Sequence, residues 1–203
     1  RMREIYDEIP NDHEAARIIT SYPGIWVSSP ELGQSALDRI AELLGVESST
    51  YIIASARKVI STQINDDAAR ANSIVDLNEV VRKSPESVVA MLVLSDLLRM
   101  GNNPDYSGSA NYLRRALETR PDQASLYPTI IQLHQKIGDR DRAIEYLQRY
   151  QKIAPNMTAS RNRVSLFVKQ GLTREAILEL EGIAAESKSP LDRISLALLL
   201  ARE

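Results

Sequence analysis

The residues that could carry acid–base or metal chemistry are few and far apart. The chain of 203 residues has two histidines, His13 and His134, and no cysteine, which excludes disulfides and thiolate chemistry. His134 lies beside Ile130 and Ile131 on the inward side of a helical pattern, and no second histidine or carboxylate stands at ligand spacing from it. We interpret His134 as a packed side chain and His13 as part of a helix start. We therefore expect no enzyme, no metal and no cofactor.

A second set of residues could hold negative charge. A cation stands two residues before each of three glycines, at Arg99, Lys136 and Lys169. Arg161 precedes Lys169 by two helical turns and shares its side. Such a row could bind an acidic or C-terminal peptide through charge-assisted hydrogen bonds. The alternative is that each cation only offsets the dipole at the end of its own helix.

Positive charge is also concentrated in the segment 111–165. This segment has more Lys and Arg than Asp and Glu, although the whole chain has a net charge of −2. The simplest interpretation is a solvated helix surface. Binding of RNA or another polyanion is the alternative, but few aromatic residues accompany the cations for base stacking. Nucleic acid is therefore not the expected partner.

The elements that must position these residues are helices, because apolar residues recur with helical spacing along most of the chain. The predicted helices cover 13–22, 30–44, 50–63, 67–83, 86–100, 108–120, 124–137, 140–153, 158–170, 173–187 and 190–202. The segment 22–29 is predicted to be a loop. Helix ends are predicted at Gly45, Gly101, Gly138 and Gly171, each in the left-handed conformation. The sequence Ser189-Pro190-Leu191-Asp192 has the pattern of a capping box.

These helices belong to a repeated unit. Four residue types recur 33 residues later: Gly138, Ala143, Ile144 and Leu147 return as Gly171, Ala176, Ile177 and Leu180. Pro85, Pro121 and Pro155 follow a similar spacing. A period of this length indicates a stack of supersecondary units.

The glycine, alanine, leucine and proline pattern resembles that of tetratricopeptide repeat (TPR) proteins, whose unit is a pair of antiparallel helices. The resemblance implies an all-α, TPR-like solenoid of stacked hairpins. It places an array over 50–203, with the best repeats at 87–123, 124–156 and 157–189 and a half repeat at 190–203. Residues 1–49 would be an irregular helical lead-in or degenerate repeats. Ala143 and Ala176 would be small residues buried at helix contacts.

The resemblance also implies a function, because such arrays bind protein or peptide partners in a concave groove. We expect a non-catalytic scaffold within a larger protein or assembly. The expected groove residues are Arg99, Gln132, Lys136, Arg161, Ser165 and Lys169. Members of the family that bind chaperone tails carry asparagines beside their cations, whereas Gln132 and Ser165 stand there in this chain, so chaperone-tail capture is not expected.

Two further expectations concern particular helices. Pro128 should distort its helix or delay its start, because proline lacks an N–H and clashes with the preceding turn. The helix from 190 onward is strongly apolar and would form half of a hairpin, so we expect self-association through this end or further repeats in a longer protein. No apolar run has the length of a membrane span and no signal peptide is visible. The chain is expected to be soluble, and its compartment is unknown.

Overall fold

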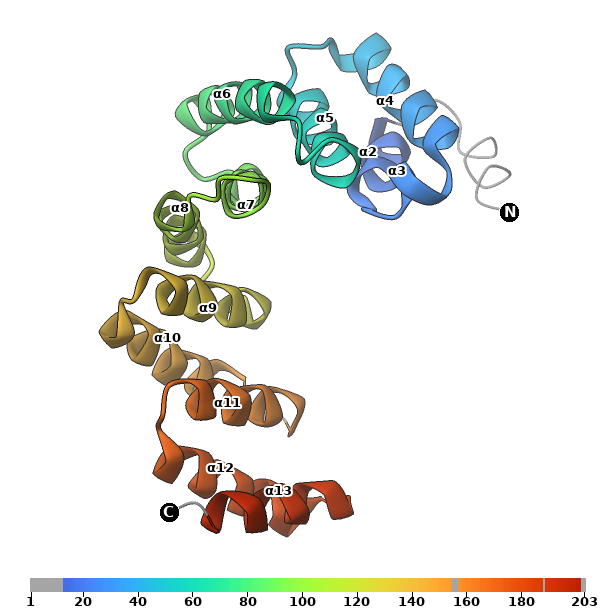
Figure 1. Cartoon of the computed structure of the whole chain (residues 1–203). Coiled ribbons are helices and arrows are strands. Elements are labelled where there is room, and N and C mark those ends of the chain that lie inside the picture. Colours follow the sequence, from blue (N-terminus) through green and yellow to red (C-terminus); the bar gives the residue numbers. More distant parts are fainter. Residues whose placement is uncertain (1–12, 155–156, 188, 202–203) are drawn as a thin grey trace. The chain divides into compact units, whose positions relative to one another are not determined.

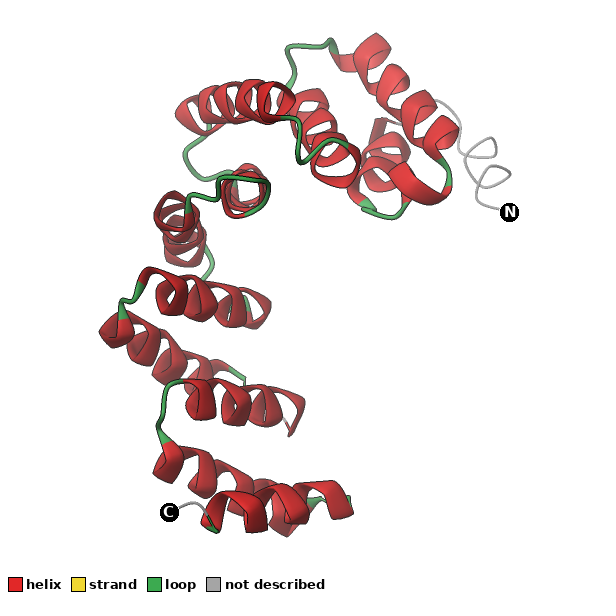
Figure 2. Cartoon of the chain, in the orientation of Figure 1, coloured by secondary structure: helices red, strands yellow, loops and turns green. Residues whose placement is uncertain are grey.

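The structure is a computed structural model that describes residues 13–154, 157–187 and 189–201. Every regular element in these ranges is a helix (Figure 2), which confirms the predicted all-helical fold. The chain divides into two compact units, Arg1–Thr119 and Arg120–Glu203. Figure 1 follows the helices in chain order through both units.

Unit 1 begins with four helices that share one core. They are α2 (His13–Ser21), α3 (Ile25–Ser28), α4 (Pro30–Leu44) and α5 (Ser49–Thr62). α2 contacts both α4 and α5. The buried core consists of Ala16, Ile25, Trp26, Ala36, Leu37, Ile40 and Ala54. Burial of this apolar surface is what holds the short elements together.

The prediction of a loop over 22–29 was wrong, because α3 forms within it. Ile25 and Trp26 are 1% and 2% exposed, so both side chains are inserted in the core. Gly33 on α4 makes room for the indole, since a Cβ there would lie 2.8 Å from a Trp26 ring carbon. Tertiary burial, which local propensity does not report, therefore decides the conformation of this segment.

The rest of unit 1 consists of helix pairs. α6 (Asp67–Lys83) packs against α5, and α7 (Val88–Arg99) packs against α8 (Tyr106–Thr119). α6 also contacts α7. Two buried serines allow α7 and α8 to approach closely, because the hydroxyls of Ser95 and Ser109 are 2.7 Å apart and Ser109 donates to the Ser95 carbonyl at 2.9 Å.

Unit 2 contains two hairpins and one further helix. Its elements are the 3₁₀ turn η1 (Ala124–Leu126), α9 (Tyr127–Ile137), α10 (Arg140–Ile153), α11 (Met157–Lys169), α12 (Thr173–Glu186) and α13 (Pro190–Leu200). α9 pairs with α10 and α11 pairs with α12, while α13 packs on α12 (Figure 1). α11 also contacts α9 and α10, so successive hairpins stack.

The predicted packing of unit 2 is confirmed at its alanines and at its proline. Ala143 and Ala176 are both fully buried, where a larger side chain would separate the helices of each pair. Pro128 occupies the first turn of α9, which starts at Tyr127 after the 3₁₀ turn rather than at 124. A proline in the first turn lacks only an N–H that would have had no partner.

Positive φ angles are confirmed at the four predicted glycine ends, although Gly45, with a ψ of 155°, is not in the left-handed helical conformation. Gly45, Gly101, Gly138 and Gly171 have φ angles of 81°, 87°, 84° and 69°. Gly101 shows why the residue matters, because a Cβ there would lie 2.1 Å from the Arg70 Nη1 atom. A side chain at this turn would therefore collide with a neighbouring helix as well as strain the backbone.

The capping box predicted at Ser189 was wrong. The Ser189 side chain makes no capping hydrogen bond at the start of α13. The expected box partner, Asp192, instead accepts hydrogen bonds from Arg161 of α11 and from Ser187. A long-range cation has displaced the local pattern, because a charge-assisted bond is stronger than a neutral cap.

Candidate functional site

Four of the predicted groove residues lie on exposed positions of unit 2. Gln132 and Lys136 are exposed on α9, and Ser165 and Lys169 are exposed on α11. Within each helix the two residues are four apart and so share a face. α9 and α11 are the first helices of successive hairpins and contact each other. Gln132 and Ser165, like Lys136 and Lys169, are 33 residues apart and so occupy equivalent positions of successive hairpins.

Arg161, the fifth predicted residue of unit 2, is engaged in an ion pair. Its Nη2 atom lies 2.8 Å from Asp192 Oδ2 and its Nε atom lies 3.1 Å from Oδ1. Asp192 is 7% exposed. The hydrogen bond from Arg161, followed by that from Ser187, lowers the pKa of Asp192 from 3.8 to about 2. Arg161 therefore links α11 to α13. Because Asp192 neutralises its charge, Arg161 attracts an acidic partner less strongly.

Arg99 belongs to unit 1 and is also paired. Its guanidinium donates to the Asp96 carboxylate from Nε at 2.9 Å and from Nη2 at 2.6 Å, within α7. The side chain is half-exposed. This pairing satisfies much of the Arg99 charge locally, so Arg99 contributes less net positive potential than its position in the sequence suggested.

His134 is a packed residue. It is 4% exposed and its ring stacks on Tyr146 with centroids 5.4 Å apart. Burial lowers the pKa of His134, and the Asp139 carboxylate at 3.5 Å opposes this effect without overcoming it. A neutral imidazole beneath a tyrosine is a structural element of the α9–α10 pair. The side chain of His13 lies outside the described residues.

Several arginines of the basic segment 111–165 are neutralised by acids. Arg163 is 4% exposed and donates to Glu179 at 2.5 Å, to the Ala154 carbonyl at 2.6 Å and to Ser160 at 2.7 Å. Other pairs in the segment are Arg114 with Glu118, Arg149 with Glu145 and Arg142 with Asp139. These contacts reduce the charge that the segment presents to a polyanion.

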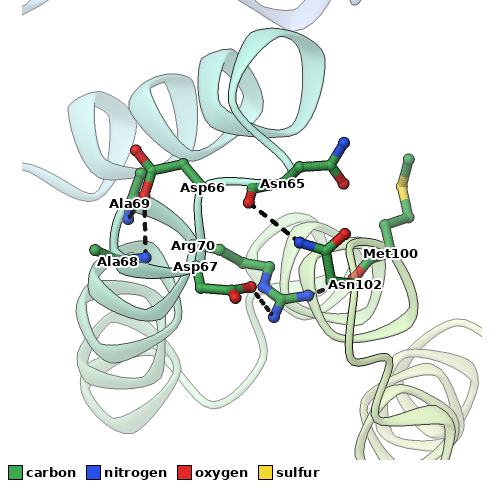
Figure 3. A network of polar contacts seen from close by, with 8 residues as sticks. All are labelled: Asn65, Asp66, Asp67, Ala68, Ala69, Arg70, Met100 and Asn102. Carbon is green, nitrogen blue, oxygen red and sulfur yellow. Dashed lines mark hydrogen bonds and ion pairs between the residues drawn. The ribbon is translucent and has the colours of Figure 1, made fainter.

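Two arginines make a contact that the sequence reasoning missed. In unit 1, Arg70 at the start of α6 donates from Nη1 to the Met100 carbonyl at the end of α7, at 2.7 Å (Figure 3). Asp67 holds the other side of this guanidinium at 2.8 Å (Figure 3). In unit 2, Arg140 at the start of α10 donates to the Gln170 carbonyl at the end of α11, at 2.8 Å.

We call these two contacts the arginine clamps. Each reaches a carbonyl 30 residues further along the chain, immediately before a left-handed glycine. A charged donor satisfies one of the last carbonyls of a helix, which have no partner within it. The only signal in the sequence was the constant distance from arginine to glycine, because the acceptor is a backbone atom and leaves no residue type to recognise.

The clamp of unit 2 borders a pocket. The pocket has a volume of about 330 Å³ and is lined by Gln135, Gly138, Arg140, Lys169 and Gln170. The sequence predicted Lys169 as a binding residue but gave no sign of Gln135 and Gln170. Arg140 contributed only to the positive charge of the segment 111–165. These side chains come from the end of α9, the start of α10 and the end of α11, which only the stacking of hairpins brings together.

The described residues hold neither a metal-binding cluster nor a membrane-spanning helix. Within residues 13–154, 157–187 and 189–201, no group of three His, Asp or Glu side chains could hold a metal ion. Among the helices of the same ranges, none combines the length and the apolar character that crossing a bilayer requires.

Comparison with known proteins identifies the fold. No protein-family model matches the chain, and no curated protein matches its sequence. Two crystal structures of MamA are similar to this chain. One matches 82% of this chain and 88% of its own at a TM-score of 0.57 and 16% identity. The other matches 78% of this chain and 90% of its own at a TM-score of 0.59 and 17% identity. A thermophilic TPR protein of Thermus thermophilus is similar at a TM-score of 0.53 and 15% identity, over 94% of this chain and 100% of that one. With the glycine, alanine and proline register of its stacked hairpins, the chain thus has a tetratricopeptide-type repeat fold.

Proposed function

We propose that the protein is a non-catalytic scaffold that binds an acidic protein or peptide on the face formed by α9 and α11. The observation that carries this proposal is the exposure of Lys136 and Lys169 at equivalent positions of two helices in contact. Gln132 and Ser165, one turn earlier on each helix, add neutral hydrogen-bonding groups. We call these four residues the α9–α11 face.

Two further features support this proposal. The repeat fold stacks hairpins so that the first helices of successive repeats lie together, which gives an extended surface suited to a peptide. His134, the histidine that could act as a general base, is 4% exposed and stacked on Tyr146, so a substrate would not reach it. The proposal gives Arg161 a secondary role, because Asp192 already binds it, and leaves Arg99 of unit 1 as a separate candidate contact.

The test uses fluorescence anisotropy with three short labelled peptides of equal length, one acidic, one neutral and one basic. We expect the acidic peptide alone to bind the wild type. The double variant Lys136→Glu/Lys169→Glu should bind it at least about tenfold more weakly, because each lost charge-assisted bond contributes roughly 1.5–3 kcal/mol.

The matched control is Lys152→Glu/Arg174→Glu. It makes the same change of net charge within unit 2, at exposed positions of the second helices α10 and α12. Equal weakening by both double variants would mean that only the net charge of unit 2 matters, and the α9–α11 face would lose its assignment.

Polyanion binding through the segment 111–165 is the alternative function. A labelled single-stranded RNA should then bind, with an affinity that falls steeply as salt is raised because counterions are released. RNA binding that Arg115→Glu and Arg120→Glu weaken, with no binding of the acidic peptide, would favour this alternative over the scaffold.

We also propose that a second copy of the chain covers part of α13. Leu191, Ile194 and Leu198 have spacings that place them on one face of this helix, and they are 71%, 53% and 59% exposed. Two such faces would bury each other's apolar surface. Light scattering over a wide concentration range should show a dimer that Leu198→Lys abolishes, and a wild-type monomer throughout would contradict the proposal.

A further inference from the structure

The pocket beside the unit 2 clamp has the chemistry of an anion site. We call it the turn pocket, because it lies between the α9–α10 turn and the end of α11. Its lining is Gln135, Gly138, Arg140, Lys169 and Gln170, with no acidic residue among them. Its volume of about 330 Å³ lies within the range of small-ligand sites.

Both cations of the turn pocket lack a carboxylate partner among the described residues. Arg140 donates one hydrogen bond, from Nη2 to the Gln170 carbonyl at 2.8 Å, which fixes the guanidinium at the pocket wall. A guanidinium carries five N–H donors, so the others remain for a ligand. Lys169, in the last turn of α11, forms no ion pair or side-chain hydrogen bond with the part of the chain that the structure describes.

The two glutamines supply a second, independent observation that points to a ligand. The side-chain nitrogens of Gln135 and Gln170 are buried and have no hydrogen-bond partner among the residues that the structure describes. Gln170 as a whole is only 9% exposed. Buried amide donors are normally satisfied, because leaving one without an acceptor costs stability. Gln135 and Gln170 both line the cationic pocket, so an acceptor that settles between them would satisfy these two donors.

A carboxylate suits this arrangement best. Its two oxygens can accept from the planar guanidinium and from amide donors at the same time, and it neutralises the local positive charge. No lining residue is aromatic, so the pocket offers no surface for stacking a nucleic-acid base. The turn leaves room for an approaching chain, because a Cβ on Gly138 would meet nothing within 4 Å.

We propose that the turn pocket binds the carboxylate of an acidic side chain of the partner peptide. This inference rests on the proposed function, and it adds a contact at the edge of the hairpins, from Gln135, Arg140 and Gln170, to the α9–α11 face. Lys169 serves both, because it stands at the end of α11 where the face meets the pocket.

The first experiment observes the orphan amides directly. In a ¹⁵N-labelled sample of the whole chain, the side-chain NH₂ signals of Gln135 and Gln170 should shift when glutarate is added. Sodium chloride at equal ionic strength should leave them unmoved. Gln151 is the internal control, because its amide already donates to Glu179. Equal shifts with chloride and glutarate, or no shift with either, would overturn the proposal.

The second experiment measures affinity for the labelled acidic peptide, amidated at its C-terminus so that only side-chain carboxylates remain. Lys169→Ala and Gln170→Met should each weaken binding, the first by about tenfold, since it removes a charge-assisted bond. Lys152→Ala is the control and should bind like the wild type. Gln170→Met keeps the length of the side chain and removes its unsatisfied amide nitrogen, so it should fold normally.

Lys136→Ala separates this inference from the proposed function. If Lys136→Ala weakens binding but Gln170→Met does not, the scaffold proposal stands and the turn pocket falls. If Gln170→Met weakens binding but Lys136→Ala does not, the turn pocket stands and the α9–α11 face falls. If only the peptide with a free C-terminus binds, or only inorganic phosphate moves the glutamine signals, the ligand is not an acidic side chain. No binding at all would remove both proposals.

Discussion

The guanidinium of Arg161 and the carboxylate of Asp192 form a bidentate ion pair that joins α11 to α13. The two residues are 31 positions apart and lie in helices that are not consecutive. Ser187, just after α12, donates to the same carboxylate at 2.5 Å. The start of α13 is therefore fixed by a polar contact rather than by a local cap.

The stability that Asp192 contributes should depend on pH. Its folded pKa of about 2 lies below the ordinary value of 3.8, so the ionised form is favoured by folding. The contribution is present above about pH 4 and is lost as pH falls through about 2. Asp192→Asn should therefore lower the urea midpoint of unit 2 at neutral pH, and the difference from wild type should shrink towards pH 2. A difference that does not change with pH would show that the ion pair adds nothing.

Arg163 should be among the least replaceable residues of unit 2. Arg163→Met removes the partner of Glu179 and a donor to the Ala154 carbonyl, both in a buried setting. Breaking a buried ion pair on one side costs about 3–5 kcal/mol of unfolding free energy. Urea denaturation should show this loss, and the double variant Arg163→Met/Glu179→Leu should recover much of it. A double variant as unstable as the single one would place the loss elsewhere.

Enlarging Ala143 should overpack the α9–α10 pair. The residue is fully buried between the helices, so Ala143→Leu should destabilise the protein by roughly 1–3 kcal/mol. Ala185→Leu, at an exposed position of α12, is the control and should change stability little. Equal chemical denaturation midpoints for wild type and Ala143→Leu would contradict the repeat register.

Two glycines with similar φ angles should respond differently to alanine. Gly45 and Gly101 have φ angles of 81° and 87°, so alanine at either should cost about 1–3 kcal/mol of backbone strain. A Cβ at Gly45 meets nothing within 4 Å, whereas at Gly101 it would lie 2.1 Å from Arg70 Nη1. Gly101→Ala should therefore also break the unit 1 clamp, at a further cost of about 1.5–3 kcal/mol.

A double-variant cycle tests the cause of that difference. In an Arg70→Ala background the clamp is already absent, so Gly101→Ala should then cost only its own backbone strain of about 1–3 kcal/mol. Denaturation midpoints of the four proteins in the cycle give the coupling energy between the two positions. Independent, additive effects would mean that the backbone strain alone explains the loss.

The fold was predictable where the cause is local. Left-handed glycines, the late start of α9 at Pro128 and the buried alanines each follow from the backbone or the size of a single residue. The short helix α3 was missed because the burial of Trp26 decides it. The Ser189 capping box was wrong because Arg161, distant in sequence, takes Asp192.

The candidate site was less predictable for the same reason. The exposed positions of Lys136 and Lys169 follow from helical periodicity, and the sequence indicated them. Gln135 and Gln170 gave no sign of a site, because an amide becomes significant only when it is buried without a partner. Arg140 was visible only as a charge, since its acceptor is a backbone carbonyl of the next hairpin.

The arginine clamps bear on how such an array can be lengthened or shortened. Each clamp has its arginine on the second helix of one hairpin and its glycine turn after the first helix of the next. A hairpin moved as a whole to another protein would carry the arginine without the carbonyl and glycine turn that it binds. A piece that runs from the start of a second helix to the following glycine turn carries both. The segment that can be copied or grafted with its clamp intact therefore begins half a repeat later than the helix hairpin that defines the repeat.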